Sequence, residues 1–158
     1  MKNKIFKYFV PPIFSIIYYK FKNISPNTLF DGDDEMFKRI IKITKLYGEY
    51  GCGKSTNWVL NNSKIDVLSV DTSALWVQKT VDINHQNKNH LKIKHCDFGE
   101  VGESGYPINF NKIENINYYG EWIWKHYKKP DTVLIDGRFR VFCFLISLKY
   151  ADEGTNII

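Results

Sequence analysis

Residues 47–60, YGEYGCGKSTNWVL, limit the folds open to this chain more than any other stretch. Gly48, Gly51 and Gly53 fall within six residues, after a segment that can form a strand and before one that can form a helix. Glycines at such a junction let the backbone turn sharply and come close to a ligand. The stretch therefore indicates an α/β domain with a ligand site beyond the end of its first strand.

The same stretch satisfies two patterns that exclude each other. Gly48, four further residues and then Gly53, Lys54 and Ser55 match the phosphate-binding loop of nucleotide triphosphatases. In that pattern Lys54 grips the β- and γ-phosphates and Ser55 holds Mg²⁺. An acid followed by alternating glycines, EYGCG, is instead typical of the first loop of a methyl-donor-binding Rossmann-like domain.

The flanking segments favour the second pattern. A phosphate loop should follow a strongly apolar strand, whereas residues 43–47, ITKLY, are a weak one. The next helix is expected to span about two turns, and a strand that ends in Asp71 follows it. Asp71 lies 20 residues beyond Gly51, the offset at which a Rossmann-type unit places a carboxylate to hold ribose hydroxyls. The alternative is that Asp71 only ends a strand and caps a helix.

Strands and helices are expected to alternate along the chain. Strands are predicted at residues 45–49, 65–71, 90–96 and 132–136, and a Gly-rich loop at residues 98–113. Helices are predicted at residues 31–41, 55–62, 122–128 and 140–149. A further helix is predicted to begin after a cap at residues 72–73. This alternation is typical of a parallel sheet. The predicted fold class is α/β, a Rossmann-like parallel sheet with helices on both faces.

In a donor-binding loop each residue type has a role. Glu49, at the strand tip, orients the loop or accepts from the ammonium group of the ligand. Gly51 and Gly53 let the backbone approach the ligand, and Ser55 caps the following helix. Asp97 follows the third strand, where its side chain can reach an adenine amino group; the alternative is a turn residue. Lys54 is then an ordinary solvent-facing residue.

Four segments carry a resemblance to a known family. EYGCGKST, VLSVDTSALW, HCDFGEVGESGYP and DTVLIDGRFRVFCFLISL occur in this order. Together they resemble class I methyltransferase-like proteins that use S-adenosylmethionine, some of which are similar to proteins of surface-polysaccharide clusters. The resemblance covers roughly residues 30–158 and implies a donor site at Glu49, Gly51, Gly53 and Asp71. Lys54 departs from it, because such loops usually carry a small or neutral residue there.

The resemblance implies a methyl transfer whose acceptor is a small molecule or a glycan. Such a reaction needs mainly positioning, and sometimes a base for the acceptor hydroxyl. Asp136 ends the fourth strand and is the candidate base. Arg138 and Arg140 begin the next helix and could bind an anionic acceptor such as a sugar phosphate. The alternatives are a capping aspartate and ordinary surface arginines.

Two other functions stay open at this point. The first is a P-loop kinase or triphosphatase that binds ATP with Mg²⁺, because Lys54 fits that pattern. The second is a membrane-associated interaction protein that kept the fold and lost the chemistry. No resident metal site is expected: His85, His90 and His95 recur every five residues, a spacing that does not place them on one helical face.

The net charge of +5 is concentrated near the N-terminus. Residues 1–30 contain five lysines and no acid, and the remainder contains 17 basic and 17 acidic side chains. A nucleic-acid partner is not expected, because its basic patch would lie on the folded domain. Residues 1–24 include IFKYFVPPIFSIIYY, which predicts either a docked helix or peripheral contact with anionic lipid. The expected location is the cytoplasm, with the inner face of the membrane as an option.

The predicted domains are a basic amphipathic segment, residues 1–30, and a Rossmann-like domain, residues 31–158. The final residues, EGTNII, predict the turn into a fifth strand that begins near Asn156. Class I methyltransferase sheets usually continue with that strand and a hairpin, so the domain is expected to be incomplete at its C-terminus. In that case most of one edge of the strand at residues 132–136 would lack a partner, and the chain would self-associate or be marginally stable.

Overall fold

The computed structural model describes residues 28–30, 34–102 and 105–158. The predicted lysine-rich segment at residues 1–24 lies outside the described residues. The chain divides into two units, Met1–Lys38 and Arg39–Ile158.

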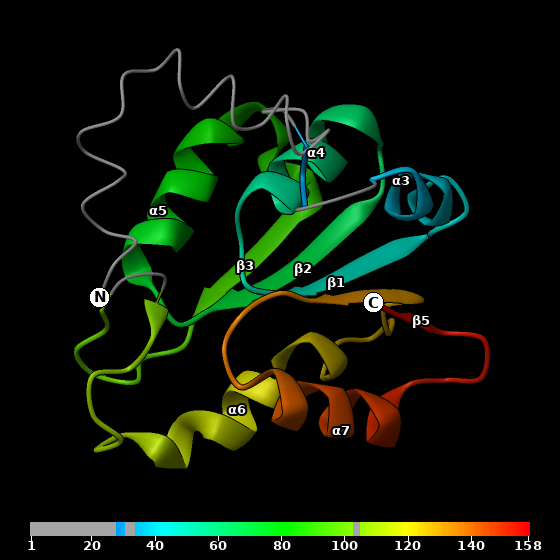
Figure 1. Ribbon diagram of the computed structural model, residues 1–158. Helices are drawn as coiled ribbons and strands as arrows, with labels where there is room; N and C mark the ends of the chain where they lie inside the picture. Colours follow the sequence, from blue (N-terminus) through cyan, green and yellow to red (C-terminus); the bar gives the residue numbers. More distant parts are fainter. Residues whose placement is uncertain (1–27, 31–33, 103–104) are drawn as a thin grey trace, which may run out of the picture. The chain divides into compact units, whose positions relative to one another are not determined.

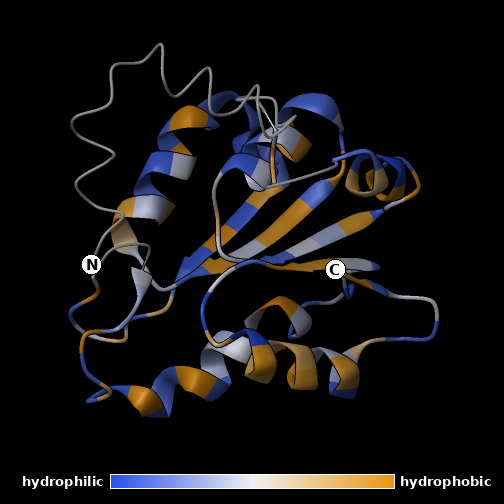
Figure 2. Cartoon of the chain, viewed as in Figure 1, coloured by the Kyte–Doolittle hydropathy of each residue, from blue (hydrophilic) through white to orange (hydrophobic). Residues whose placement is uncertain are grey.

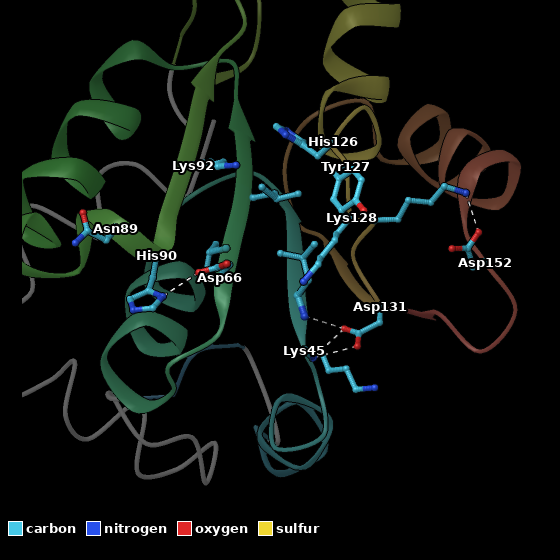
Figure 3. Close-up of a pocket in the computed structure, with 14 residues that line it drawn as sticks. Lys45, Asp66, Asn89, His90, Lys92, His126, Tyr127, Lys128, Asp131 and Asp152 are labelled. Carbon is cyan, nitrogen blue, oxygen red and sulfur yellow. Dashed lines mark hydrogen bonds and ion pairs between the residues drawn. The ribbon is translucent and has the colours of Figure 1, made fainter.

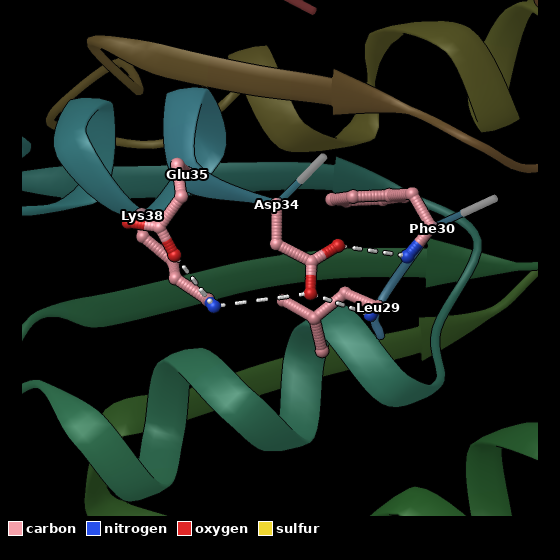
Figure 4. A network of polar contacts seen from close by, with 5 residues as sticks. All are labelled: Leu29, Phe30, Asp34, Glu35 and Lys38. Atoms are coloured by element: carbon pink, nitrogen blue, oxygen red, sulfur yellow. Dashed lines mark hydrogen bonds and ion pairs between the residues drawn. The ribbon is translucent and has the colours of Figure 1, made fainter. Parts of the chain in front are cut away.

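In the first unit, a buried aspartate organises the start of helix α3 (Glu35–Ile41). The carboxylate of Asp34 accepts hydrogen bonds from the backbone amides of Leu29 and Phe30, at 2.9 and 3.2 Å (Figure 4). Its backbone carbonyl accepts from the amide of Lys38 at 3.0 Å, which closes the first helical turn. Acidic side chains are favourable at this end of a helix because the helix dipole is positive there.

The second unit is built on five parallel strands in the order β3-β2-β1-β4-β5 (Figure 1). This finding confirms the predicted α/β class. The chain runs from the central strand β1 outward to β3 and then returns to the other side of β1 with β4. The strands are β1 (Leu46–Tyr50), β2 (Asp66–Asp71), β3 (Leu91–His95), β4 (Thr132–Ile135) and β5 (Asn156–Ile157).

Helices cover both faces of this sheet. Figure 1 shows α4 and α5 on one face and α6 and α7 on the other. Short 3₁₀ helices η1 and η3 precede β3 and α6, and η4 continues α6. The helices and turns are α4 (Lys54–Asn62), α5 (Ala74–Ile83), η1 (His85–His90), η3 (Ile113–Asn115), α6 (Ile116–Glu121), η4 (Trp122–Trp124) and α7 (Arg140–Tyr150).

The core between the sheet and the α6–α7 layer is aromatic. Tyr50, at the end of β1, is fully buried against Tyr119, with ring centroids 5.7 Å apart. The Tyr50 hydroxyl accepts from Nε1 of Trp124 at 2.9 Å and donates to the carbonyl of Gly120. Buried polar groups must find such partners, because an unpaired one is costly. Figure 2 shows the hydrophobic stretches of the strands that supply the rest of this core.

The predicted aromatic helix at residues 122–128 is wrong. The helix is α6, which begins six residues earlier at Ile116 and ends in the 3₁₀ turn η4. Its buried face follows a helical period through Tyr119, Gly120 and Ile123. That period starts within the polar stretch NINYYG, so the tryptophans marked the end of the helix rather than its beginning.

The fourth strand has the two neighbours predicted for it, and its edge is better paired than expected. β4 pairs with β1 on one side and with β5 on the other. Although β5 has only two residues, the amide of Ile135 donates to the carbonyl of Ile158 and the amide of Ile158 donates to the carbonyl of Val133, both at 2.9 Å. The prediction that most of this edge lacks partners is therefore wrong. The backbone of the last three residues, 156–158, forms the hydrogen bonds along this edge that were expected to be absent.

Candidate functional site

The candidate site lies at the carboxyl ends of the strands. Parallel pairing brings the end of β1 beside the ends of β2 and β4, so Asp71 and Asp136 flank the loop of residues 51–53. The strand order reverses between β1 and β4. In open α/β sheets, ligands bind beyond the carboxyl ends of the strands at this reversal.

Glu49 fixes the loop to the helix that follows it. The side chain is only 1% exposed, and its two carboxylate oxygens accept hydrogen bonds from the hydroxyls of Ser55 and Thr56. Burial raises the pKa of Glu49 to about 8, although both hydroxyls oppose the shift and the charge of Asp136 adds to it. This geometry matches the loop-orienting role predicted for Glu49. The carboxylate is directed into the protein rather than toward an external ammonium group.

The prediction that Ser55 caps α4 is wrong. The capping residue is Gly53, and the helix begins at Lys54, which is exposed as expected. Thr56 supplies the hydroxyl that accepts from the Gly53 amide, at 3.0 Å. The hydroxyls of Ser55 and Thr56 both donate to Glu49, but only that of Thr56 also accepts from the Gly53 amide.

The two glycines of the loop have different surroundings. Gly51 has φ +91°, and a Cβ there would lie 2.8 Å from Cα of Gly137, in the loop after β4. At Gly53 a Cβ would meet no atom within 4 Å. Gly51 therefore permits a close backbone contact between two loops, while the side of Gly53 is open to a ligand.

Asp71 ties three segments together at the end of β2. The side chain is buried, and Oδ2 accepts from the amide of Cys52 at 2.8 Å while Oδ1 accepts from the amide of Ser73 at 2.7 Å. The cap of α5 is Ser73, whose hydroxyl accepts from the amide of Trp76. Each carboxylate oxygen has a further lone pair, so Asp71 retains acceptors for a ligand hydroxyl.

Cys52, at the centre of the loop, is a thiol that stays protonated. Burial and the neighbouring carboxylate of Asp71 raise its pKa well above the usual value. Nucleophilic cysteines need the opposite environment, with a lowered pKa. The loop therefore offers backbone and shape rather than a reactive sulfur.

Asp97 is bonded to residues of the loop that follows β3. It is exposed and forms an ion pair with Lys112, and it accepts from the amide of Gly99 at 2.7 Å. The ammonium of Lys112 holds the pKa of Asp97 below its usual value. Asp97 follows β3, which β2 separates from the central strand. Its contacts are those of the predicted alternative, a turn residue.

Asp136 and Arg140 form a pair in the loop after β4. Oδ1 of Asp136 lies 2.8 Å from Nη2 of Arg140, and both side chains are more than half exposed. Nε of Arg140 also donates to the carbonyl of Gly137 at 3.3 Å. Arg138, two residues earlier, is half-buried. An acid and a guanidinium thus lie together at the carboxyl edge of the sheet.

The geometry of the loop differs from that of a phosphate loop. Gly48, the first glycine of that pattern, lies inside β1 and pairs with Val133 of β4. Only residues 51–53 then connect β1 to α4, too few to wrap around a phosphate with consecutive amides. Ser55, the predicted Mg²⁺ ligand, donates its hydroxyl to Glu49 instead.

Sequence reasoning missed the aromatic residues beneath the site. Phe98, Tyr119 and Phe139 pack together, with ring centroids 5.0 to 6.1 Å apart. Phe139 has φ +54°, which is uncommon for a bulky residue. Gly137 was also missed, although Asp-Gly is a turn signal that could have identified it.

The described residues include neither a membrane-spanning helix nor a metal-binding group of side chains. None of their helices has the length and apolar character that crossing a membrane requires. None of their histidine, cysteine and acidic side chains gather in threes in a way that could hold a metal ion.

Comparison with known proteins identifies a structural neighbour. No protein-family model and no curated protein matches the chain. Among solved structures, it is similar to a methyltransferase-like protein from Silicibacter pomeroyi, with 27% identity and a TM-score of 0.64. The match covers 72% of this chain and 61% of that protein, so the chain spans less than two thirds of the length of its neighbour. The fold is therefore methyltransferase-like.

Proposed function

We propose that this domain transfers a methyl group from S-adenosylmethionine to a small-molecule or glycan acceptor. The observation that carries the proposal is the position of Gly53. Its open side lies at the carboxyl edge, where the strand order reverses, between strands that end at Asp71 and Ile135. The similarity to a methyltransferase-like protein supports the same reaction class.

The residues at this edge suit the donor. The loop of residues 51–53 leaves open space beside Gly53, and Asp71 keeps free lone pairs that can accept ribose hydroxyls. Glu49 holds the loop in place by binding Ser55 of α4. When bound, the donor supplies an electrophilic methyl group on a positively charged sulfur. Asp97 can bind the adenine amino group of the donor only if that group replaces the ammonium of Lys112.

Asp136 and Arg140 provide the acceptor side. Arg140, with Arg138, would bind an anionic group of the acceptor, because guanidinium groups form strong paired hydrogen bonds with phosphate or carboxylate oxygens. In the structure, Arg140 donates one such hydrogen bond to Asp136. An anionic acceptor competes for that bond and frees the Asp136 carboxylate. The carboxylate would then lie beside the acceptor hydroxyl and take the proton of that hydroxyl.

Two substitutions test the donor site. Asp71→Ala should weaken the binding of S-adenosylhomocysteine by about 1.5–3 kcal/mol, the size of a charge-assisted hydrogen bond. Lys54→Ala should leave that affinity nearly unchanged, because Lys54 is exposed at the start of α4. Thermal melts of both variants separate a loss of binding from a loss of folding. An unchanged affinity in a folded Asp71→Ala variant would remove Asp71 from the donor site.

A further inference from the structure

A hollow of about 790 Å³ opens at the amino ends of the strands, the edge of the sheet opposite the candidate site (Figure 3). Pockets for small molecules usually measure about 300–1,000 Å³. The walls come from the starts of β1 and β2, from η1 and β3, and from the segment that follows η4. No residue of the proposed methyl-transfer site lines it, so an inference about this hollow does not depend on that proposal.

Two of the three acids that line the hollow have side-chain partners, a histidine for one and a lysine for the other. Oδ1 of Asp66 lies 2.9 Å from Nδ1 of His90, across the first residues of β2 and the end of η1. Oδ1 of Asp152 lies 2.7 Å from Nζ of Lys129. Figure 3 shows Asp66 and His90 at one side of the hollow and Asp152 at the other. Their carboxylates are therefore directed toward these partners.

The third acid is held by the backbone. Asp131 precedes β4, and its carboxylate accepts from the amide of Lys45 at 3.0 Å and from the amide of Leu46 at 3.2 Å. These two amides lie at the start of β1, which begins at Leu46. The negative charge of Asp131 is thus used to fix the start of β1 beside β4.

Three of the four lysines that line the hollow, Lys45, Lys92 and Lys128, have no acidic partner among the described residues. Among the described residues, neither Lys92 of β3 nor Lys128 forms an ion pair. Figure 3 shows both side chains directed into the space between β3 and the segment after η4. Two positive charges therefore face one hollow whose acids are already engaged.

An imidazole and a phenol complete this wall. Nε2 of His126 is buried and has no hydrogen-bond partner among the described residues. The ring is held edge-to-face against Trp122, with centroids 4.8 Å apart. Burial and the charge of Lys92 lower the pKa of His126. Tyr127, the next residue, is fully exposed beside it.

We propose that this hollow binds a small molecule through a phosphate or pyrophosphate group, held by Lys92 and Lys128 beside the ring of His126. Two ammonium groups offer donors from two walls, and a phosphate group accepts hydrogen bonds on several sides at once. The exposed ring of Tyr127 offers a flat apolar surface to the remainder of the ligand. The site is separate from the donor site and binds its ligand in the absence of S-adenosylmethionine.

A calorimetric titration of the full chain with inorganic pyrophosphate, at constant ionic strength, tests the proposal. Saturable binding is expected, and the double variant Lys92→Gln/Lys128→Gln should weaken it at least about tenfold, as the loss of charge-assisted bonds implies. The matched control Lys79→Gln/Lys149→Gln removes the same charge from α5 and α7 and should change affinity less than about twofold. The ring signals of His126 in NMR spectra should shift during the titration.

Several outcomes would overturn the proposal. Absence of saturable pyrophosphate binding is one, and an equal loss in the control variant is another, because it would mean general surface attraction. A third is an unmoved His126 signal. Binding of phosphatidic-acid vesicles that the Lys92→Gln/Lys128→Gln variant loses, without binding of free pyrophosphate, would replace the small molecule with a lipid head group.

Discussion

Replacing Gly51 with alanine probes the contact on which the candidate site is built. Gly51 has φ +91°, and an added Cβ would lie 2.8 Å from Cα and 2.9 Å from the amide nitrogen of Gly137. Both are backbone atoms of the loop after β4, so neither can move aside as a flexible side chain would. Gly154 offers a matched control, because it has φ +87° but no atom within 4 Å of the added Cβ.

The two substitutions separate the effect of the dihedral angle from that of packing. A left-handed backbone destabilises an alanine by about 1–2 kcal/mol, and both variants share this loss. Overpacking adds about 1–3 kcal/mol at Gly51 alone. We therefore expect Gly51→Ala to lower the free energy of unfolding by roughly 2–5 kcal/mol and Gly154→Ala by roughly 1–2 kcal/mol. At about 2–4 °C per kcal/mol for a chain of this size, thermal melts resolve the difference.

Urea denaturation of both variants and of the unaltered protein measures the two losses directly. Because Gly51 adjoins Gly53, the Gly51→Ala variant should also bind S-adenosylhomocysteine more weakly, while Gly154→Ala should not. Equal losses of stability in the two variants would refute the reasoning. They would mean that the loops after β1 and β4 do not meet in the way that shapes the site.

Three further predictions follow from single features. Burial raises the pKa of Glu49 from 4.5 to about 8, so between these pH values the folded protein holds a proton that the unfolded chain has lost. The free energy of unfolding should therefore fall as the pH rises from 4.5 to about 8. Urea denaturation at several pH values should show a weaker pH dependence in the Glu49→Gln variant. Tyr50→Phe leaves the Trp124 indole N–H and the Gly120 carbonyl without their partner and should destabilise by about 1–3 kcal/mol, measured by the same melts. Sedimentation with anionic vesicles should show salt-sensitive binding that deletion of residues 1–24 abolishes; equal sedimentation of both forms would contradict it.

Much of the fold could be predicted because it depends on short-range patterns. The segments DVLSVD and TVLI are apolar runs that end next to acids, and both became inner strands of the parallel sheet. The offset from Gly51 to Asp71 placed both residues at one edge, since a strand, a turn, a helix and a return strand bring these positions together. The structure places Asp71 within 2.8 Å of the loop amide at Cys52.

The finer parts of the site depend on contacts that no local pattern contains. Glu49 was expected to orient the loop or to accept from a ligand, and no local pattern showed that its partners would be the hydroxyls of Ser55 and Thr56. Asp97 pairs with Lys112, 15 residues along the chain, across an irregular loop whose path has no periodic signal. The contact between Gly51 and Gly137 joins two loops 86 residues apart.

The hollow at the amino edge was missed for the same reason. Its lining residues extend from Lys45 to Asp152 and come from several strands and loops. Lys92 looked like an ordinary exposed position of an alternating strand. Its relation to Lys128 and His126 follows only from the sheet order, which places β3 beside β2 and brings the segment after η4 across one face.

The central claim is that the carboxyl edge of the sheet binds a methyl donor. Calorimetric titration of the unaltered protein with S-adenosylhomocysteine and, separately, with ATP and Mg²⁺ tests it most directly. We predict saturable binding of S-adenosylhomocysteine and none of ATP–Mg²⁺ at this edge, because Gly48 lies within β1 and Ser55 is bound to Glu49. Tight binding of ATP–Mg²⁺ that Lys54→Ala abolishes, without binding of S-adenosylhomocysteine, would contradict the account and identify a phosphate loop.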